Sequence, residues 1–452
     1  MLRNITFFIA LLWGIVSSAQ IIDVSGADTE FKMQQINSSI LNVSLTTGDI
    51  VTFSENSDEG EFTRLSLPNF HISRDVGEPE LPEVHSLIEI PQGAEPRIEI
   101  ISSSYRDYFL ADLGIETPIY PAQPSLSKSQ NPGDIPFTIN IDVYLKNTML
   151  EKELVSTNIE GQLRAIRIAN LNIRPIDYNP IEGILRVYTN LEVNIHMDGA
   201  DFTKTEEIKT TYYSPYFEAI YNQIPNYESS SRSDDMISDP VTYVIVANSS
   251  FESSLDEFIE WKTQKGYHVI VGYTNDIGSS ASAIESYIHN LYNNPEEGVM
   301  PPSFVLLVGD TPQLPVSYSS GGHVSDNDYG DVSGDMMPEI LYGRFSAQTP
   351  MHLQSQIDKT IEYEKYEMAD PSFLGEVVMI SGVDASYAPT YGNGQINYGT
   401  DYYFNNDHGI YSNTYLYPAS GSSGSQIKSD ISDGAAYVNY TAHGYESGWA
   451  DP

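Results

Sequence analysis

The sequence predicts two unlike parts: an all-β domain, followed by an α/β domain whose parallel sheet carries helices on both faces. An alternating apolar pattern, typical of a strand with one buried face, fills residues 185–195. A polar break rich in Ser and Asp follows at 226–239. Beyond Pro240, short apolar strands alternate with helical patterns, and this alternation indicates a parallel sheet.

Length, charge and cysteine content narrow the range of functions. The 452 residues suffice for two or three domains, and the 40% hydrophobic content is enough for sizeable cores. With 22 basic and 62 acidic residues, the formal net charge is −40. This argues against nucleic acid or an anionic membrane as a partner, because both are bound through clustered Lys and Arg. Within these residues there is no cysteine to form a disulfide, ligate a metal or act as a nucleophile.

Residues 1–19 are predicted to be a signal peptide. A positively charged start is followed by an apolar run from Ile5 to Val16, which is too short to span a bilayer comfortably. Small residues then mark a cleavage site after Ala19. No other stretch approaches ~18 consecutive apolar residues, so we expect a protein without a transmembrane segment, secreted or held at the cell surface. The alternative is an uncleaved membrane anchor.

Residues 20–228 are expected to form the β-rich domain. Turn residues at 179–183 lead into the alternating strand, prolines punctuate the earlier part, and no long helical stretch is predicted. Residues 229–239 then read as an exposed linker. Its lone basic residue, Arg232, is a candidate processing site, although an ordinary linker charge explains it equally well.

Residues 240–452 are expected to form the α/β domain. Strands are predicted at 243–247, 269–271, 304–308, 377–380, 413–417 and 436–440, and helices at 251–265, 281–292, 353–366, 396–406 and 425–432. In parallel sheets, catalytic groups and ligands collect at the carboxyl ends of the strands. The residues that follow these strands are therefore the first candidates for a site.

A carboxylate and an imidazole follow two of these strands. Asp384 comes after the strand at 377–380, and His443 after the strand at 436–440. His is the usual general base near neutral pH, and a neighbouring carboxylate would orient its ring. Gly444 lets the backbone approach a substrate and can free an N–H for an oxyanion. The alternative is a histidine with only a local structural bond. The sequence contains no HExxH, P-loop or GxSxG motif.

Several segments resemble the gingipain family of caspase-like cysteine endopeptidases, most closely its lysine-specific branch. In the back half these are NYTAHGYESGWADP (439–452), FVLLVGD (304–310), GRFS (343–346), QIDKTIEYEK (356–365) and YGTDYYFNNDHG (398–409). The front half is similar to the gingipain propeptide in GEPELPEVHSLIEIPQGA (77–94), PAQPSLSKS (121–129) and IRPIDYNPIEGILRVYTNLEVNI (173–195).

The resemblance implies an inhibitory propeptide in residues 20–228 and the N-terminal part of a caspase-like catalytic domain in residues 240–452. It implies that protein or peptide substrates are cleaved by a Cys–His dyad. In that scheme His443 is the catalytic histidine and Asp384 the acidic residue that supports it. Gly444 supplies an amide to the oxyanion hole, and Thr441 begins the wall of the substrate pocket.

The family's nucleophilic cysteine follows the histidine motif by some tens of residues, whereas this sequence ends at Pro452. We therefore expect a catalytic domain truncated at its C-terminus, with the nucleophile beyond Pro452 and no activity in the fragment itself. Nothing marks Ser447 as a replacement nucleophile. Two alternatives stay open: a non-catalytic surface or binding protein of the same fold, or a sortase-like processing peptidase.

An acidic cluster lies between these motifs. Five carboxylates fall within fourteen residues: Asp326, Asp328, Asp331, Asp335 and Glu339. They repel one another unless water or a cation intervenes, and calcium suits such flexible acidic loops. The spacing does not fit an EF-hand, because the twelfth position from Asp326 is Met337. A solvated acidic loop is the alternative. Since gingipain-like catalytic domains bind calcium, the resemblance favours a structural calcium ion.

Overall fold

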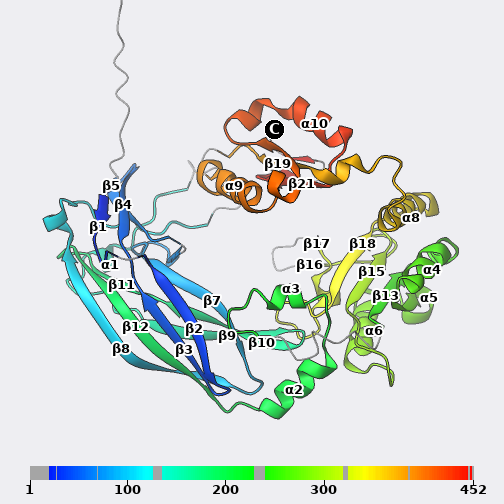
Figure 1. Cartoon of the computed structure of the whole chain (residues 1–452), viewed down its shortest axis with the longest axis horizontal. Coiled ribbons are helices and arrows are strands. Elements are labelled where there is room, and N and C mark those ends of the chain that lie inside the picture. Colours follow the sequence, from blue (N-terminus) through cyan, green and yellow to red (C-terminus); the bar gives the residue numbers. More distant parts are fainter. Residues whose placement is uncertain are drawn as a thin grey trace, which may run out of the picture. The chain divides into compact units, whose positions relative to one another are not determined.

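The computed structural model describes residues 20–26, 28–68, 70–125, 135–228, 240–318, 324–384, 387–445 and 448–449 (Figure 1). The chain divides into two compact units. Of the described residues, those from 20 to 353 belong to the first unit and those from 354 onward to the second. The predicted signal peptide and linker, with Ala19 and Arg232, lie outside the described residues.

Antiparallel sheets form the front part of the first unit, which confirms the predicted β-rich domain. The largest sheet has five strands: β2 (Glu30–Asn37), β3 (Ile40–Thr46), β8 (Glu95–Phe109), β11 (Ile176–Asn179) and β12 (Ile184–Asp198). β12 pairs with β3, β8 and β11. Its alternation is confirmed, because Leu185, Val187, Leu191, Val193 and Ile195 are all buried.

Two smaller sheets and a few short helices complete this domain. One sheet has the order β6 (His71–Ile72), β7 (Pro82–Ile90), β10 (Ile166–Ile173) and β9 (Val155–Leu163), and the other β1 (Gln20–Ile22), β4 (Ile50–Ser57) and β5 (Gly60–Ser66). The helices are α1 (Ile141–Tyr144), α2 (Phe202–Thr211) and α3 (Glu218–Tyr221). The ten-residue α2 is missing from the sequence-based prediction. It buries none of its residues, so it carries no apolar stripe.

The back part of the first unit holds a four-stranded parallel sheet. Its order is β14 (His268–Tyr273), β13 (Thr242–Ala247), β15 (Phe304–Val308) and β18 (Leu341–Phe345). The helices around it are α4 (Asp256–Gln264), α5 (Thr274–Ile277), α6 (Ala281–Asn293) and α7 (Asn327–Gly330). Ile284 and Ile288 of α6 pack in one buried cluster with apolar side chains of β13 and β15. A short ladder joins β16 (Ser317–Tyr318) and β17 (Val324–Ser325).

The second unit holds a three-stranded parallel sheet, with β19 (Glu376–Ser381) between β20 (Tyr411–Tyr415) and β21 (Tyr437–Thr441). Ile396 of α9 (Asn393–Tyr402) packs on one face of β19, and Ile427 of α10 (Gly424–Asp433) packs on the other. This confirms the predicted parallel sheet with helices on both faces. The predicted strands of the back half are thus divided between two sheets, one in each unit. α8 (Pro350–Lys365) crosses the division between the units.

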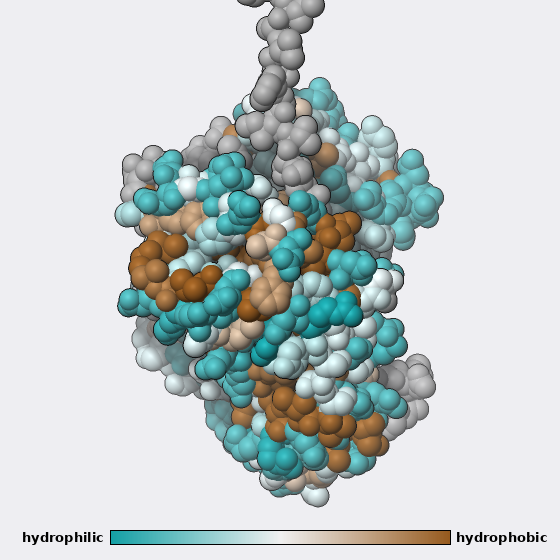
Figure 2. All heavy atoms as spheres, turned by 90° about the vertical axis from the view of Figure 1, so that its left-hand side faces the viewer, coloured by the Kyte–Doolittle hydropathy of each residue, from teal (hydrophilic) through white to brown (hydrophobic). Residues whose placement is uncertain are grey.

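The outer surface of the front domain is mixed in polarity. Figure 2 looks at the side on the left of Figure 1 and shows apolar side chains in separate patches among hydrophilic ones. Several large apolar residues of β8 are exposed, among them Ile100, Ile101 and Tyr105. Among the helices in the described part of the chain, none is long and apolar enough to cross a membrane.

Candidate active site

His443 and Asp384 meet at one edge of the three-stranded sheet. Asp384 follows the end of β19 and His443 follows the end of β21, and these two strands are neighbours. Because parallel strands deliver their carboxyl ends to a common edge, the two side chains are brought together across 59 residues of sequence. His443 Nε2 lies 2.7 Å from Asp384 Oδ2. The histidine side chain is 40% exposed and the carboxylate 16%.

The carboxylate of Asp384 is held by the backbone that follows it. Its Oδ1 accepts a hydrogen bond from the Tyr387 N–H at 3.0 Å, and its carbonyl oxygen accepts one from Ala388 at 2.8 Å. One turn of π-helix (Ala388–Gly392) begins here and leads into α9. The anchored carboxylate can therefore fix the orientation of the imidazole ring.

The two ring nitrogens of His443 have different surroundings. Nε2 faces Asp384, whereas Nδ1 is buried and has no hydrogen-bond partner among the described residues. Pairing with an ionised carboxylate assigns the proton of the neutral ring to Nε2 and leaves a lone pair on Nδ1. This arrangement leaves Nδ1 available to accept or return a proton.

Two residues that the sequence did not single out support the edge. The Tyr440 hydroxyl donates to the carbonyl oxygen of His443 at 2.9 Å, and the Tyr440 ring stacks on Trp449 at 4.4 Å. Gln395, on α9, accepts a hydrogen bond from the Thr441 hydroxyl at 3.0 Å. The close spacing of Tyr440 and His443 is a weak sequence signal for the first contact. No such signal exists for Gln395, which lies 46 residues from Thr441.

Thr441 and Gly444 flank the histidine. The Thr441 hydroxyl also accepts from Asn439 Nδ2 at 3.0 Å, and its carbonyl oxygen accepts from the Gly382 N–H at 3.1 Å, so the residue is firmly tied to the sheet. Gly444 pairs with Trp449 in the small β22–β23 ladder (Gly444–Tyr445 and Gly448–Trp449). A Cβ at Gly444 would meet nothing closer than 3.6 Å, so packing alone does not require a glycine there. The oxyanion and pocket roles stay predictions.

The carboxylates of the acidic cluster point to protein donors. Asp326 binds the Arg344 guanidinium through both oxygens, at 2.7 and 2.8 Å. Asp331 accepts three backbone N–H groups from residues 334–336, at 2.8 to 3.2 Å. Asp335 Oδ2 accepts a hydrogen bond, at 2.6 Å, from the backbone N–H of Gln162, which belongs to the front domain.

Glu339 and Asp328 complete this cluster. Glu339 is 2% exposed, and it accepts hydrogen bonds from Val332 and from the Ser333 backbone and hydroxyl. Burial raises the pKa of the Glu339 carboxyl, against these hydrogen bonds, which favour its charged form. Asp328 is exposed. Within the described residues, no group of three or more His, Asp or Glu side chains converges as metal ligands would. Calcium binding by this cluster stays a prediction.

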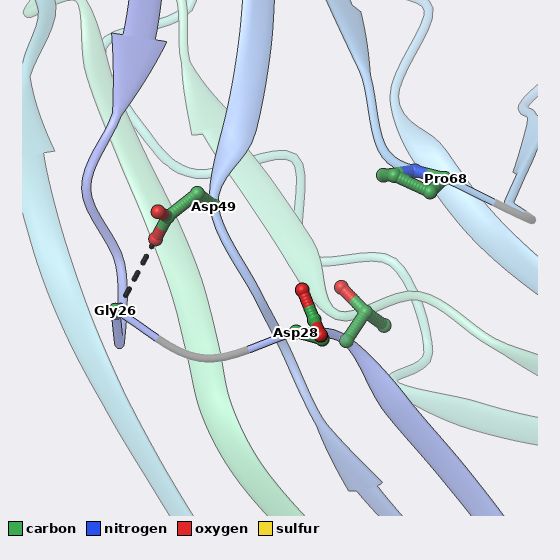
Figure 3. A pocket seen from close by; sticks show the side chains of 5 residues that line it. Gly26, Asp28, Asp49 and Pro68 are labelled. Carbon is green, nitrogen blue, oxygen red and sulfur yellow. Dashed lines mark hydrogen bonds between the residues drawn. The ribbon is translucent and has the colours of Figure 1, made fainter.

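A separate pocket opens in the front domain and contains none of the predicted site residues. It is lined by Gly26, Asp28, Thr29, Asp49 and Pro68 (Figure 3). Asp49 accepts the backbone N–H groups of Val24 at 2.9 Å and of Gly26 at 3.4 Å. The bond from Val24 contributes most to lowering the pKa of the Asp49 carboxyl. Asp49 thus caps a loop of its own domain, which is a structural role.

Each half of the chain matches a known protein family. Residues 237–452 match the model of Peptidase family C25, and residues 31–230 match that of its propeptide, Propeptide_C25. Lys-gingipain of Porphyromonas gingivalis is 36% identical over 398 residues, which is 87% of this chain and 23% of that protein. Gingipain R2 of the same species is 25% identical over 434 residues, which is 94% of this chain and 55% of that protein.

Solved structures are similar to parts of the chain. A structure that addresses the zymogenic latency of gingipain K from Porphyromonas gingivalis covers 40% of this chain and all of its own, at 28% identity and a TM-score of 0.39. The sequence matches define the class: a peptidase domain preceded by its propeptide. The chain belongs to peptidase family C25, the family of the gingipains. It spans about a quarter of the length of Lys-gingipain.

Proposed function

We propose that this chain is part of an exported cysteine endopeptidase precursor, with His443 and Asp384 as two members of its catalytic centre. The bond of 2.7 Å between His443 Nε2 and Asp384 Oδ2, at the carboxyl ends of β19 and β21, carries this proposal. The family match supports peptide-bond hydrolysis as the reaction and the front domain as an inhibitory propeptide. Export is proposed from the apolar run within residues 1–19.

In the proposed reaction a cysteine thiol is the nucleophile, and His443 with Asp384 handles the proton transfer. A cysteine thiolate attacks the scissile carbonyl carbon and forms an acyl-enzyme, while the imidazolium gives its proton to the leaving amine. His443 exchanges that proton through Nδ1, because Nε2 is engaged by Asp384. Asp384 orients the ring. No cysteine occurs in these 452 residues, so the proposed nucleophile belongs to sequence outside them.

The test is a set of point variants in the complete protein. His443→Ala removes proton transfer and should lower kcat by ~10²–10⁴-fold on lysyl or arginyl peptide substrates. Asp384→Asn leaves a base that is less well oriented, so its loss should be smaller. His408→Ala is the matched control, because His408 is an exposed histidine of the same unit whose Nδ1 lies 3.0 Å from the side chain of its neighbour Asn405.

Thermal unfolding of each variant separates chemistry from folding. All three should melt as the wild type does, since His443 and Asp384 are partly exposed. Near-wild-type activity in His443→Ala would refute the assignment, and joint loss of activity and folding would indicate a structural histidine. Turnover that depends on His443 but resists thiol reagents would refute the cysteine mechanism.

A further inference from the structure

A buried arginine of the front domain is held by the back part of the first unit, residues 240–353, which is called the back domain from here on. Arg164 opens the two-residue loop between β9 and β10 and is 1% exposed. Its guanidinium donates five hydrogen bonds: to the carbonyl oxygens of Tyr212 (2.7 Å), Pro301 (3.2 Å), Pro302 (2.7 Å) and Glu339 (2.9 Å), and to Ser303 Oγ (3.3 Å). All its N–H groups are thereby satisfied. The bond to Tyr212 stays within the front domain, and the other four cross to the back domain. We call the four back-domain acceptors, at Pro301, Pro302, Ser303 and Glu339, the carbonyl socket.

The backbone of Arg164 is unfavourable for an arginine. Its φ is +50°, in the left-handed region. A positive φ at the first position of a two-residue hairpin loop is normally supplied by glycine, since a side chain is strained there. An arginine in this position is best explained by what its side chain binds.

The carbonyl socket lies at the amino ends of the parallel strands. Pro301, Pro302 and Ser303 immediately precede β15, and Glu339 lies just before β18. The Ser303 N–H donates to Thr242 at the start of β13, which ties the socket to the sheet. Ligands of parallel sheets gather at the opposite, carboxyl ends. The socket therefore occupies the edge of this sheet that substrates do not normally use.

Aromatic pairs also join the front domain to the back domain. Tyr212 of the front domain stacks on Tyr292 at 4.8 Å between ring centroids. Tyr216 packs its ring on the edge of Phe304 at 4.6 Å and joins its hydroxyl to that of Tyr267 at 2.6 Å. Tyrosine and arginine are the residues that most often dominate the free energy of a protein interface. The surface thus resembles an interface between partners.

We propose that Arg164 and the carbonyl socket anchor the front domain to the back domain after the 229–239 segment is cut, so that this cleavage alone does not release the propeptide. The inference rests on the proposed propeptide role but on no step of catalysis. Withdrawing the guanidinium leaves converging carbonyl groups without donors, which opposes release. Because four of the five bonds end on carbonyl oxygens and none on a carboxylate, release should respond only weakly to salt.

The experiment measures release of the front domain from the full chain. The recognition sequence of a site-specific protease replaces part of 229–239, the chain is immobilised through a C-terminal tag, and the cut front domain is followed in the eluate. Arg164→Ala should speed release at least about tenfold, as expected for loss of an interface arginine. Arg167→Ala is the matched control, because the Arg167 guanidinium also binds carbonyls, at Pro91 and Ala94, but within the front domain.

Arg164→Lys keeps the charge but cannot reach all five acceptors, so its release rate should fall between those of the wild type and Arg164→Ala. If Arg164→Ala does not fold, the release rate of Arg164→Lys tests the anchor instead. Retention of the variant front domain at the wild-type rate would overturn the anchor, as would immediate loss of the wild-type front domain on cleavage. The assay needs no turnover, so an inactive protein that retains its front domain refutes only the proposed enzyme.

Discussion

The contacts of His443 orient its imidazole ring and give its two nitrogens different surroundings. Asp384 engages one nitrogen, Tyr440 fixes the backbone carbonyl, and the second nitrogen is left without a partner among the described residues. A histidine serving only structure would be expected to use both nitrogens when they are buried. The unpaired Nδ1 therefore marks the side on which the proposed thiol should lie in the complete protein.

The hydrogen bonds of Asp331 predict that its carboxylate stabilises the acidic cluster without a cation. Three backbone N–H groups depend on its carboxylate, so Asp331→Ala should lower the free energy of unfolding by about 1–3 kcal/mol. The loss should be equal in calcium and in chelator, because these donors need no cation. Asp328→Ala is the control, since Asp328 is exposed and should leave stability unchanged.

The same melting curves test calcium. If the loop rearranges around a bound ion, chelation should lower the Tm of the wild type, and that response should disappear in Asp328→Ala. A Tm that ignores both chelator and added calcium would leave the cluster as a set of turns ordered by backbone donors. Ligand that binds only the folded state raises stability by ~2.7 kcal/mol at a hundredfold excess over Kd, so binding would be visible.

Glu80 predicts that the stability of the front domain depends on pH. Burial raises the pKa of its carboxyl to about 7, although Arg64 lies 2.6 Å away and favours the charged form. The folded state therefore binds this proton more tightly than the unfolded state, whose pKa is 4.5. Stability from this group is complete below pH 4.5 and is lost as the pH rises to about 7.

Thermal unfolding between pH 4 and 8 checks this sign. Glu80→Gln should flatten the fall in Tm across the window from 4.5 to about 7. Glu59→Gln, at an exposed position of the same domain, should leave the slope as it is. A wild-type Tm that rises through this window would contradict a buried carboxyl with a raised pKa.

At the scale of elements, the π-helical turn after β19 positions Asp384. A Cβ on Gly392 would lie 2.5 Å from the hydroxyl of Ser381, which is fully buried at the end of β19. Gly392→Ala should therefore push the turn away and destabilise the protein by about 1–3 kcal/mol. Tyr387, whose N–H binds the Asp384 carboxylate, immediately precedes this turn, so activity of the complete protein should fall as well.

Gly394→Ala is the control for this prediction. Gly394 lies two residues further on, in α9, and a Cβ there meets nothing within 4 Å. Alanine is a better helix former, so this variant should be as stable as the wild type or gain ~0.5–1 kcal/mol. Equal Tm values for the two alanine variants would show that the turn is not tightly packed against β19.

Elements with a regular apolar pattern could be predicted, and elements without one could not. The alternation of β12 and the apolar face of α6 follow from contact with a core, so their limits differ from the prediction by only a few residues. α2 buries nothing, and the π-helical turn depends on one close contact between Gly392 and Ser381. Neither cause leaves a periodic trace in the sequence.

At the scale of the whole molecule, prediction succeeded where strand ends impose proximity. Asp384 and His443 lie at the ends of neighbouring parallel strands, so their meeting could be expected without coordinates. Arg164 meets the carbonyl socket only through the packing of two domains, and residues 137 to 175 positions apart contribute to it. Because most of the acceptors are backbone carbonyls, their positions cannot be predicted from a side-chain motif.

Arg164 is synthesised well before most of the residues that bind it. At ~5–20 residues per second, Pro301 follows on the order of ten seconds later. By then β10 can already be paired with β7 and β9, which presents the guanidinium on a finished hairpin. When β15 and β18 are synthesised, the Arg164 guanidinium is already in place to bind the carbonyl groups at their amino ends. A chain that begins at residue 240 has no such guanidinium, and water alone must satisfy those carbonyls.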